Sequence, residues 1–157
     1  MPSRMLIAED VFLETQRFLR ARGRQGKEGL VLWAGLKADH SSAVFHCVKA
    51  GDRWAHGVKL GFDQLMRLTQ HLGEQGLVLL AQVHNHPGRI PHSEGDERNP
   101  VSHAAGYLSI VVPELGLEGI DLAACYAYEY VGRLEWRALD LEEKTETLHV
   151  TRRSMKL

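Results

Sequence analysis

An almost continuous apolar run at residues 77–83 (LVLLAQV) constrains the fold of this chain more than any other stretch. A short run of this kind, with glycine just before it, is typical of a strand buried inside a sheet. Residues 29–35 (GLVLWAG) and 44–48 predict two more strands, joined by a turn near residues 40–42. The chain is therefore expected to build a sheet that other elements cover.

Two segments show helical periodicity. Residues 9–23 place one set of side chains on a single helix face: Val11, Phe12, Thr15, Phe18 and Leu19. Residues 62–72 do the same with Phe62, Leu65, Met66, Thr69 and Leu72. Two glycines follow each segment and end the predicted helix, Gly23 and Gly26 in the first case and Gly73 and Gly76 in the second.

The rest of the chain adds strands after a long polar stretch at residues 84–106. Residues 107–113 (YLSIVVP) predict a strand, and residues 119–139 predict a hairpin that turns near residues 131–133. Residues 50–60 show no period and predict a loop or edge segment. This order predicts one domain at residues 1–157, of the α/β class, with a mixed β-sheet flanked by helices.

Composition excludes several classes of function. The chain is 44% hydrophobic and carries a formal net charge of -1, so nothing favours nucleic acid as a partner. No apolar stretch approaches the ~20 residues of a membrane helix, and the N-terminus lacks the pattern of a signal peptide, so a cytoplasmic protein is expected. Cys47 and Cys125 lie among apolar residues and are expected to be buried thiols.

The polar stretch begins with a candidate metal site. His84 and His86 lie at the end of the predicted central strand, where residues i and i+2 point to the same face. Asp96 follows across a loop rich in glycine and proline and can supply an oxygen ligand. Two histidines and one carboxylate leave one tetrahedral position open, which is typical of catalytic zinc sites, where bound water has a pKa of about 7. Glu28, just before a buried strand, is the candidate proton acceptor, and Ser93 could hold the oxyanion.

Each of these features also has an ordinary structural interpretation. A His-x-His pair is often only a pair of hydrogen-bonded or surface histidines, and Glu28 alone fits a solvated charge. Ser93 and Asp96 fit the first turn of a short helix that stops before Pro100. His92 and Glu94 receive no role. The adjacent letters HNH do not indicate a nuclease, because that motif disperses its residues and needs basic surface for phosphates.

Together the features resemble the JAMM (MPN-plus/JAB) family of zinc metalloproteases. The resemblance lies in EGLVLWAG (28–35), VHNHP (83–87) and SEGD (93–96), and it extends over a core of about residues 5–138, leaving a C-terminal tail at 140–157. It implies the cytidine-deaminase-like fold of that family. The strand YLSIVVP is similar to a bacterial branch found in operons for ubiquitin-like conjugation, some of them in antiviral defence. Two departures are an interval from His86 to Ser93 one residue shorter than usual, and Asn85 where Thr or Ser is frequent.

Carried over residue by residue, the resemblance implies one Zn²⁺ per chain held by His84, His86 and Asp96, with Glu28 as general base and Ser93 at the oxyanion. It implies cleavage of peptide or isopeptide bonds after the C-terminus of a ubiquitin-like protein, which with its conjugates and other operon components would be the partner. Two alternatives stay open: a catalytically inactive MPN scaffold, and a zinc hydrolase acting on a sulfur-carrier protein or a small molecule. Neither a nucleic acid nor a membrane is an expected partner, and the sequence does not set the oligomeric state.

Overall fold

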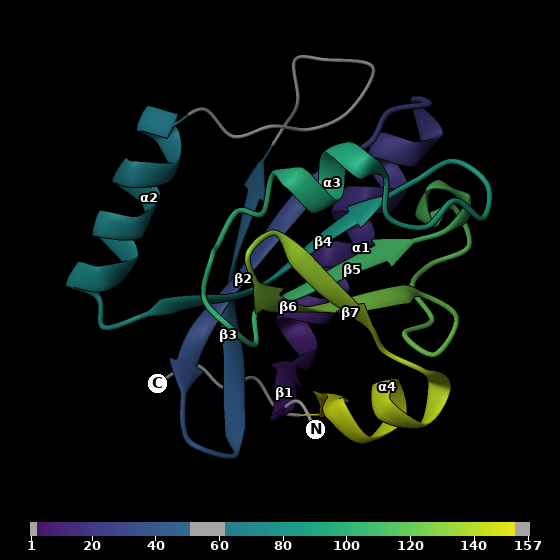
Figure 1. Ribbon diagram of the computed structural model, residues 1–157. Coiled ribbons are helices and arrows are strands. Elements are labelled where there is room, and N and C mark those ends of the chain that lie inside the picture. Colours follow the sequence, from purple (N-terminus) through teal and green to yellow (C-terminus); the bar gives the residue numbers. More distant parts are fainter. Residues whose placement is uncertain (1–2, 51–61, 153–157) are drawn as a thin grey trace.

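The protein folds around one mixed sheet (Figure 1). The computed structural model describes residues 3–50 and 62–152. Within them the strand order is β7-β6-β5-β4-β2-β3-β1-β8. The strands are β1 (Arg4–Ala8), β2 (Leu30–Lys37), β3 (Ser41–Ala50), β4 (Val78–Asn85), β5 (Leu108–Val112), β6 (Tyr126–Gly132), β7 (Glu135–Ala138) and β8 (Leu148–Thr151). The helices are α1 (Glu9–Arg24), α2 (Phe62–Glu74), α3 (Glu94–Arg98) and α4 (Leu141–Thr147), with a 3-10 turn, η1 (Glu114–Gly116).

The mixed sheet flanked by helices confirms the predicted α/β class, and β4 is a central strand as its apolar run indicated. It pairs with β2 in antiparallel and with β5 in parallel orientation. The segment predicted as a loop at residues 50–60 falls outside the described residues except for Ala50, which ends β3. None of the described helices is long and apolar enough to cross a membrane.

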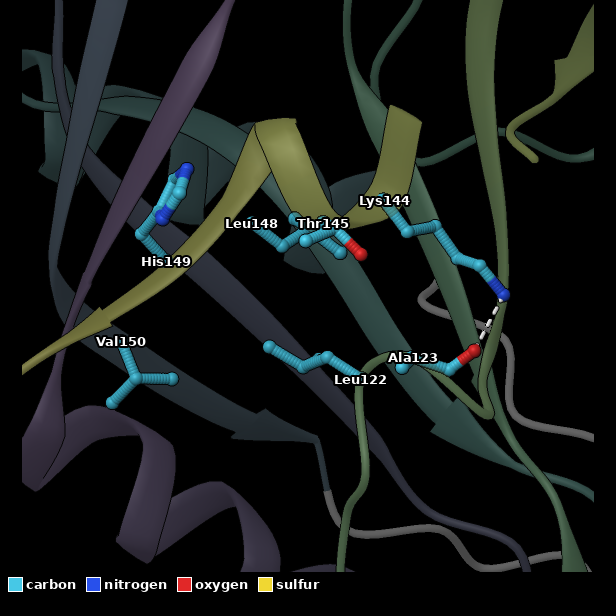
Figure 2. Close-up of a pocket in the computed structure, with 7 residues that line it drawn as sticks. All are labelled: Leu122, Ala123, Lys144, Thr145, Leu148, His149 and Val150. Atoms are coloured by element: carbon cyan, nitrogen blue, oxygen red, sulfur yellow. Dashed lines mark hydrogen bonds between the residues drawn. The ribbon is translucent and has the colours of Figure 1, made fainter. Parts of the chain in front are cut away.

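The C-terminal segment adds structure that periodicity did not predict. α4 begins at a capping box formed by Asp140 and Glu143, and β8 pairs with β1 in parallel orientation. The C-terminal tail at 140–157 therefore joins the sheet through β8, which ends at Thr151, and residues 153–157 lie outside the described residues. A pocket of about 390 Å³ lies beside α4 and β8, where Lys144 donates to the Ala123 carbonyl oxygen at 2.8 Å (Figure 2). It shares no residue with the candidate metal site.

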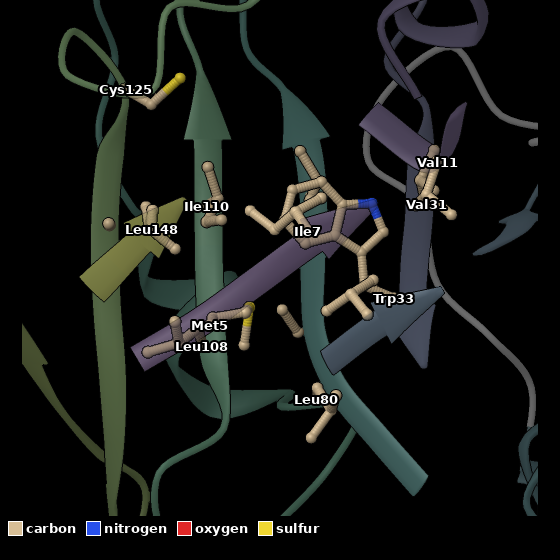
Figure 3. Packing of buried hydrophobic residues seen from close by; sticks show 14 of the residues in the cluster. Met5, Ile7, Val11, Val31, Trp33, Leu80, Leu108, Ile110, Cys125 and Leu148 are labelled. Atoms are coloured by element: carbon tan, nitrogen blue, oxygen red, sulfur yellow. The ribbon is translucent and has the colours of Figure 1, made fainter. Parts of the chain in front are cut away.

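The core lies between the sheet and α1 (Figure 3). On α1 the buried side chains include Val11, Thr15 and Leu19, all from the predicted apolar face. Trp33 of β2 is 1% exposed, and its indole N–H donates to the Thr15 hydroxyl at 2.9 Å. That bond satisfies both polar atoms where burial would otherwise penalise them. The predicted face of α1 is thus fixed against the sheet.

α2 forms where its periodicity predicted it, but it stands to one side of the sheet (Figure 1). Of the apolar face that predicted the helix, Leu72 is buried, whereas Met66 is 55% exposed. The described residues therefore cover only part of this face. Helical periodicity identifies a helix without identifying what covers it.

Candidate metal centre

β4 brings the two predicted histidine ligands to one point at its end. His84 is the penultimate residue of the strand and His86 follows it, so both rings lie on the same face, with centroids 4.6 Å apart. Both residues are buried. The prediction that the two histidines share one face is therefore confirmed.

α3, which lies beside the end of β4, brings in Asp96 (Figure 1). Its Oδ2 lies 3.5 Å from His84 Nε2 and 3.4 Å from His86 Nε2. Ser93 caps this helix: its Oγ accepts from the Asp96 backbone N–H at 3.0 Å, and its own N–H donates to Asp96 Oδ2 at 2.8 Å. The capping interpretation of Ser93 and Asp96 is confirmed, and it is also what aims Asp96 at the histidines.

His84, His86 and Asp96 could hold a metal ion. Each offers one ligand atom, and these atoms lie within 4.8 Å of one another. Zinc bonds of about 2.0–2.1 Å at tetrahedral angles separate neighbouring ligand atoms by about 3.3 Å, close to the two nitrogen–oxygen distances observed. The donor set, two imidazoles and one carboxylate, also suits zinc, but it does not by itself identify the metal.

Ring nitrogens of both His84 and His86 remain available to bind a metal ion. His86 Nδ1 lies 3.0 Å from the carbonyl oxygen of Ile90, which orients the ring and leaves Nε2 for a metal. Neither ring nitrogen of His84 has a hydrogen bond within the described structure, although both are buried. The Asp96 carboxylate lies 3.5 Å from Nε2, too far for a good hydrogen bond, and a buried polar atom without one is costly, so the site favours a further group at His84.

Asp96 and His86 shift each other's pKa values. Burial opposes ionisation of Asp96, but the neighbouring His84 and His86 outweigh it and hold the pKa of the Asp96 carboxyl well below its usual range. For His86, burial favours the neutral ring, but Asp96, the Ile90 carbonyl and the charge of Glu28 together raise its pKa. The carboxylate is therefore ready to act as a ligand near neutral pH.

Glu28 lies at the same end of the sheet. Leu30 of β2 is in register with His84, and half-buried Glu28 lies two residues before Leu30, the first residue of β2. Its backbone is fixed, because Arg22 donates to the Glu28 carbonyl oxygen through Nη2 at 3.0 Å and Nε at 3.2 Å. The negative charge of Glu28 makes a small contribution to the raised pKa of His86, after those of Asp96 and the Ile90 carbonyl. The structure thus brings together His84, His86, Ser93 and Asp96, and it places the backbone of Glu28 at the same end of the sheet.

Sequence reasoning gave no role to Asn85, which ties the site together. It is fully buried, and its Oδ1 accepts from the Gly29 N–H at 2.7 Å. Its Nδ2 donates to the carbonyl oxygens of Leu115 at 2.8 Å and Leu19 at 3.2 Å. The sequence offered one hint of this role, the place of a polar side chain between two candidate histidine ligands. It could not identify the partners of Asn85, because they are distant in the sequence.

His92 was also left without a role, and here the sequence carries no signal. Its ring stacks on Tyr128 with a centroid distance of 3.9 Å, and its Nε2 lies 2.7 Å from the Ser109 hydroxyl. Burial lowers the pKa of His92 to about 4, with His84 acting in the same direction. The ring is therefore neutral near pH 7.

Comparison with known proteins gives a sequence match over almost the whole chain. No family model matches the chain. A probable metalloprotease of Sinorhizobium fredii is 33% identical over 150 residues, and the match covers 92% of this chain and 93% of that protein. The chain belongs to the same family as this probable metalloprotease. The resemblance to metalloproteases thus extends over almost the whole chain and beyond the motifs at residues 28–35 and 83–96.

Solved structures show the fold. A JAB1/MPN domain protein of Archaeoglobus fulgidus has a TM-score of 0.53 at 16% identity, covering 95% of this chain and 99% of that one. A protein of Desulfitobacterium hafniense has a TM-score of 0.69 at 11% identity, covering 96% and 95%. A third, from Salinibacter ruber, has a TM-score of 0.57 at 16% identity, covering 87% and 89%. The fold is therefore shared with JAB1/MPN domain proteins.

Proposed function

We propose that this protein is a JAMM-type, zinc-dependent peptidase that cleaves after the C-terminus of a ubiquitin-like modifier, either to release it from conjugates or to process its precursor. The observation that carries the proposal is the convergence of His84, His86 and Asp96 at the end of β4. The family relationship of the chain to a probable metalloprotease supports peptidase chemistry. The modifier as substrate, and a role beside a conjugation operon in antiphage defence, rest on the resemblance of the motifs.

The proposed chemistry assigns one task to each residue. A zinc ion held by His84, His86 and Asp96 would lower the pKa of a bound water to about 7 and polarise the scissile carbonyl. Glu28 accepts the proton that the attacking water loses and returns it to the leaving amine as the C–N bond breaks. Ser93 Oγ accepts from the Asp96 N–H, so its own hydroxyl hydrogen remains able to donate to the oxyanion.

The edge of β3 near the site offers a place where an extended substrate tail could bind. Among the described residues, β3 pairs with β1 only from Ser41 to Val44 and then continues to Ala50. Ala50 is in register with Leu30, which is in register with His84. We expect a Gly-rich tail to add to this edge by strand pairing. Equal cleavage rates for tails with bulky and small residues at the scissile bond would contradict this mode.

The proposal is tested by incubating a fusion of a ubiquitin-like protein, ending in its natural glycine, with zinc-loaded enzyme. Wild type is expected to release the modifier, and Glu28→Gln to lose at least about 100-fold in rate because the proton acceptor is gone. Glu94→Gln is the matched control: it also removes one carboxylate near the site, but Glu94 pairs with Arg98 on an exposed turn. Its rate should equal that of wild type.

Other outcomes separate the alternatives. Zinc binding without cleavage of any ubiquitin-like fusion would favour a hydrolase of another substrate. Folded protein that takes up no zinc would favour the inactive scaffold. Equal activity of wild type and Glu28→Gln would contradict the assigned proton acceptor.

A further inference from the structure

We propose that His92 is a positioning residue of the metal centre, which anchors the loop before α3 to the sheet and thereby fixes Asp96 against His84 and His86. The inference deepens the proposed function and rests on its metal site. His92 is not itself a ligand in this arrangement: its ring centroid lies 6.3 Å from that of His84, and the ligand group consists of His84, His86 and Asp96 alone.

A buried polar chain connects His92 to the strand that carries the ligands. The His92 Nε2 atom lies 2.7 Å from Ser109 Oγ, which accepts from Gln82 Nε2 at 3.2 Å. Gln82 and Ser109 are in register on β4 and β5, and both are buried. Gln82 precedes His84 by two residues, so it points to the same face of β4 as the metal ligands.

The same chain also holds the far side of α3. Gln82 Oε1 accepts from the backbone N–H of Val101 at 3.3 Å. The segment from His92 to Val101, with α3 inside it, is thus attached at both ends to one pair of side chains beneath the site. Burying an amide or hydroxyl without a hydrogen-bond partner is costly. Gln82 and Ser109 therefore depend on their bonds to the loop, and the loop is held in place by the same bonds.

Aromatic contacts fix the ring and the helix from the other side. His92 stacks on Tyr128 with an interplanar angle of 8°, and its backbone N–H donates to the Tyr128 hydroxyl at 3.2 Å. Trp136 meets the edge of the His92 ring, with centroids 5.1 Å apart, and its indole N–H donates to the Glu97 carbonyl oxygen at 3.0 Å. Asp96 therefore lies between two anchored residues, His92 and Glu97. A shift of either anchor moves the carboxylate relative to the histidines.

The test measures zinc affinity of the purified full chain by competition with a chromogenic chelator. His92→Ala should weaken binding by about 10–100-fold, because loss of the residues that orient metal ligands typically has an effect of this size. His92→Gln, whose amide can still reach Ser109 Oγ, should recover most of that loss. Ser109→Ala removes the other half of the contact and should weaken binding in the same direction.

His103→Ala is the matched control. It removes another histidine from the same row of rings, because His103 packs edge-on against Tyr130 with centroids 5.8 Å apart. In the described structure the ring and Nδ1 of His103 contact Tyr130, which belongs to β6 and not to the loop before α3, so zinc affinity should be unchanged. Thermal unfolding of the metal-free variants is measured in parallel, so that affinity is compared only between folded proteins.

A merely structural role would lower the thermal stability of His92→Ala and leave the zinc affinity of the folded variant at the wild-type value, which would overturn the inference. If His92→Ala does not fold, wild-type affinity in Ser109→Ala overturns it equally. Failure of the proposed function gives a different pattern: wild type binds zinc and His92→Ala weakens it, but no ubiquitin-like fusion is cleaved. A wild type that binds no zinc contradicts both.

Discussion

One oxygen of the Asp96 carboxylate serves both a helix cap and the candidate metal centre. The Ser93 N–H donates to the same oxygen, Oδ2, that faces both histidines. A motif that is common at helix starts therefore becomes a device that holds a ligand oxygen at a fixed place. This double use explains why the structural and the functional interpretation of Ser93-x-x-Asp96 are compatible.

Asn85 is predicted to be the most sensitive polar residue of the site outside its ligands. Asn85→Ala leaves the Gly29 N–H and the carbonyl oxygens of Leu19 and Leu115 without their buried partner. We expect a loss of about 2–4 kcal/mol in the free energy of unfolding, because each unpaired buried group is costly. Urea unfolding of the metal-free protein measures it. Asn99→Ala, the same change on an exposed turn, should cost less than about 1 kcal/mol, and equal losses would contradict this prediction.

At the level of residues, the sequence predicted what local spacing can encode. His84, His86, Ser93 and Asp96 follow from strand and helix-cap geometry, and Glu28 from its place before a buried strand. Asn85 and His92 escaped because their partners, such as Leu115 and Ser109, are distant in the sequence. Spacing along one segment cannot report such contacts.

Among the elements, β2 carries a sharp steric constraint. A Cβ added to Gly35 would lie 1.8 Å from the Ala43 carbonyl oxygen of β3, next to an irregularity in the register. Gly35→Ala is therefore expected to lower the unfolding free energy by about 2 kcal/mol or more, since overpacking forces the backbone to move.

Gly73→Ala provides the comparison, with the opposite sign. Nothing lies within 4 Å of a Cβ at this position in α2. Alanine should stabilise the helix by about 0.5–1 kcal/mol. Both variants are measured by urea unfolding, and a neutral Gly35→Ala would contradict the close approach of β2 and β3.

The elements that the sequence predicted are those with long or unbroken patterns. α1 and α2 fall where helical periodicity placed them, and β2 and β4 fall on the two predicted apolar runs. β1, α4 and β8 were missed because each is short, and parallel pairing of β1 with β3 and β8 joins distant segments. For α2 the pattern predicted the helix, but not that much of its apolar face lies uncovered by the described residues.

For the whole molecule, acid is expected to weaken the metal-free protein partly through His92. Burial lowers its pKa from the ordinary 6.5 to about 4, so between these values the unfolded chain binds a proton that the native state refuses. The stability linked to this group is fully present above pH 6.5 and is lost as the pH falls through 6.5 toward 4, by about 3 kcal/mol in total. His86 has a raised pKa and acts in the opposite direction, and it is present in both proteins compared below.

Urea unfolding of wild type and His92→Gln at pH 7 and pH 4.5 isolates this contribution. Wild type should lose more unfolding free energy than the variant on acidification. Asp96 does not confound the comparison. Its pKa is 3.8 in the unfolded chain and lower still in the folded protein, so the carboxyl is ionised in both states at pH 4.5. Equal losses would contradict a buried, neutral His92.

The most direct test of the central claim is the zinc content of the purified protein, determined by elemental analysis of wild type and His84→Ala. Three ligands converging from β4 and α3 predict about one zinc per wild-type chain and its loss in the variant. Thermal unfolding of both metal-free proteins confirms that the variant folds. Wild-type protein that stays free of zinc after reconstitution, or a variant that retains it, would contradict the metal centre.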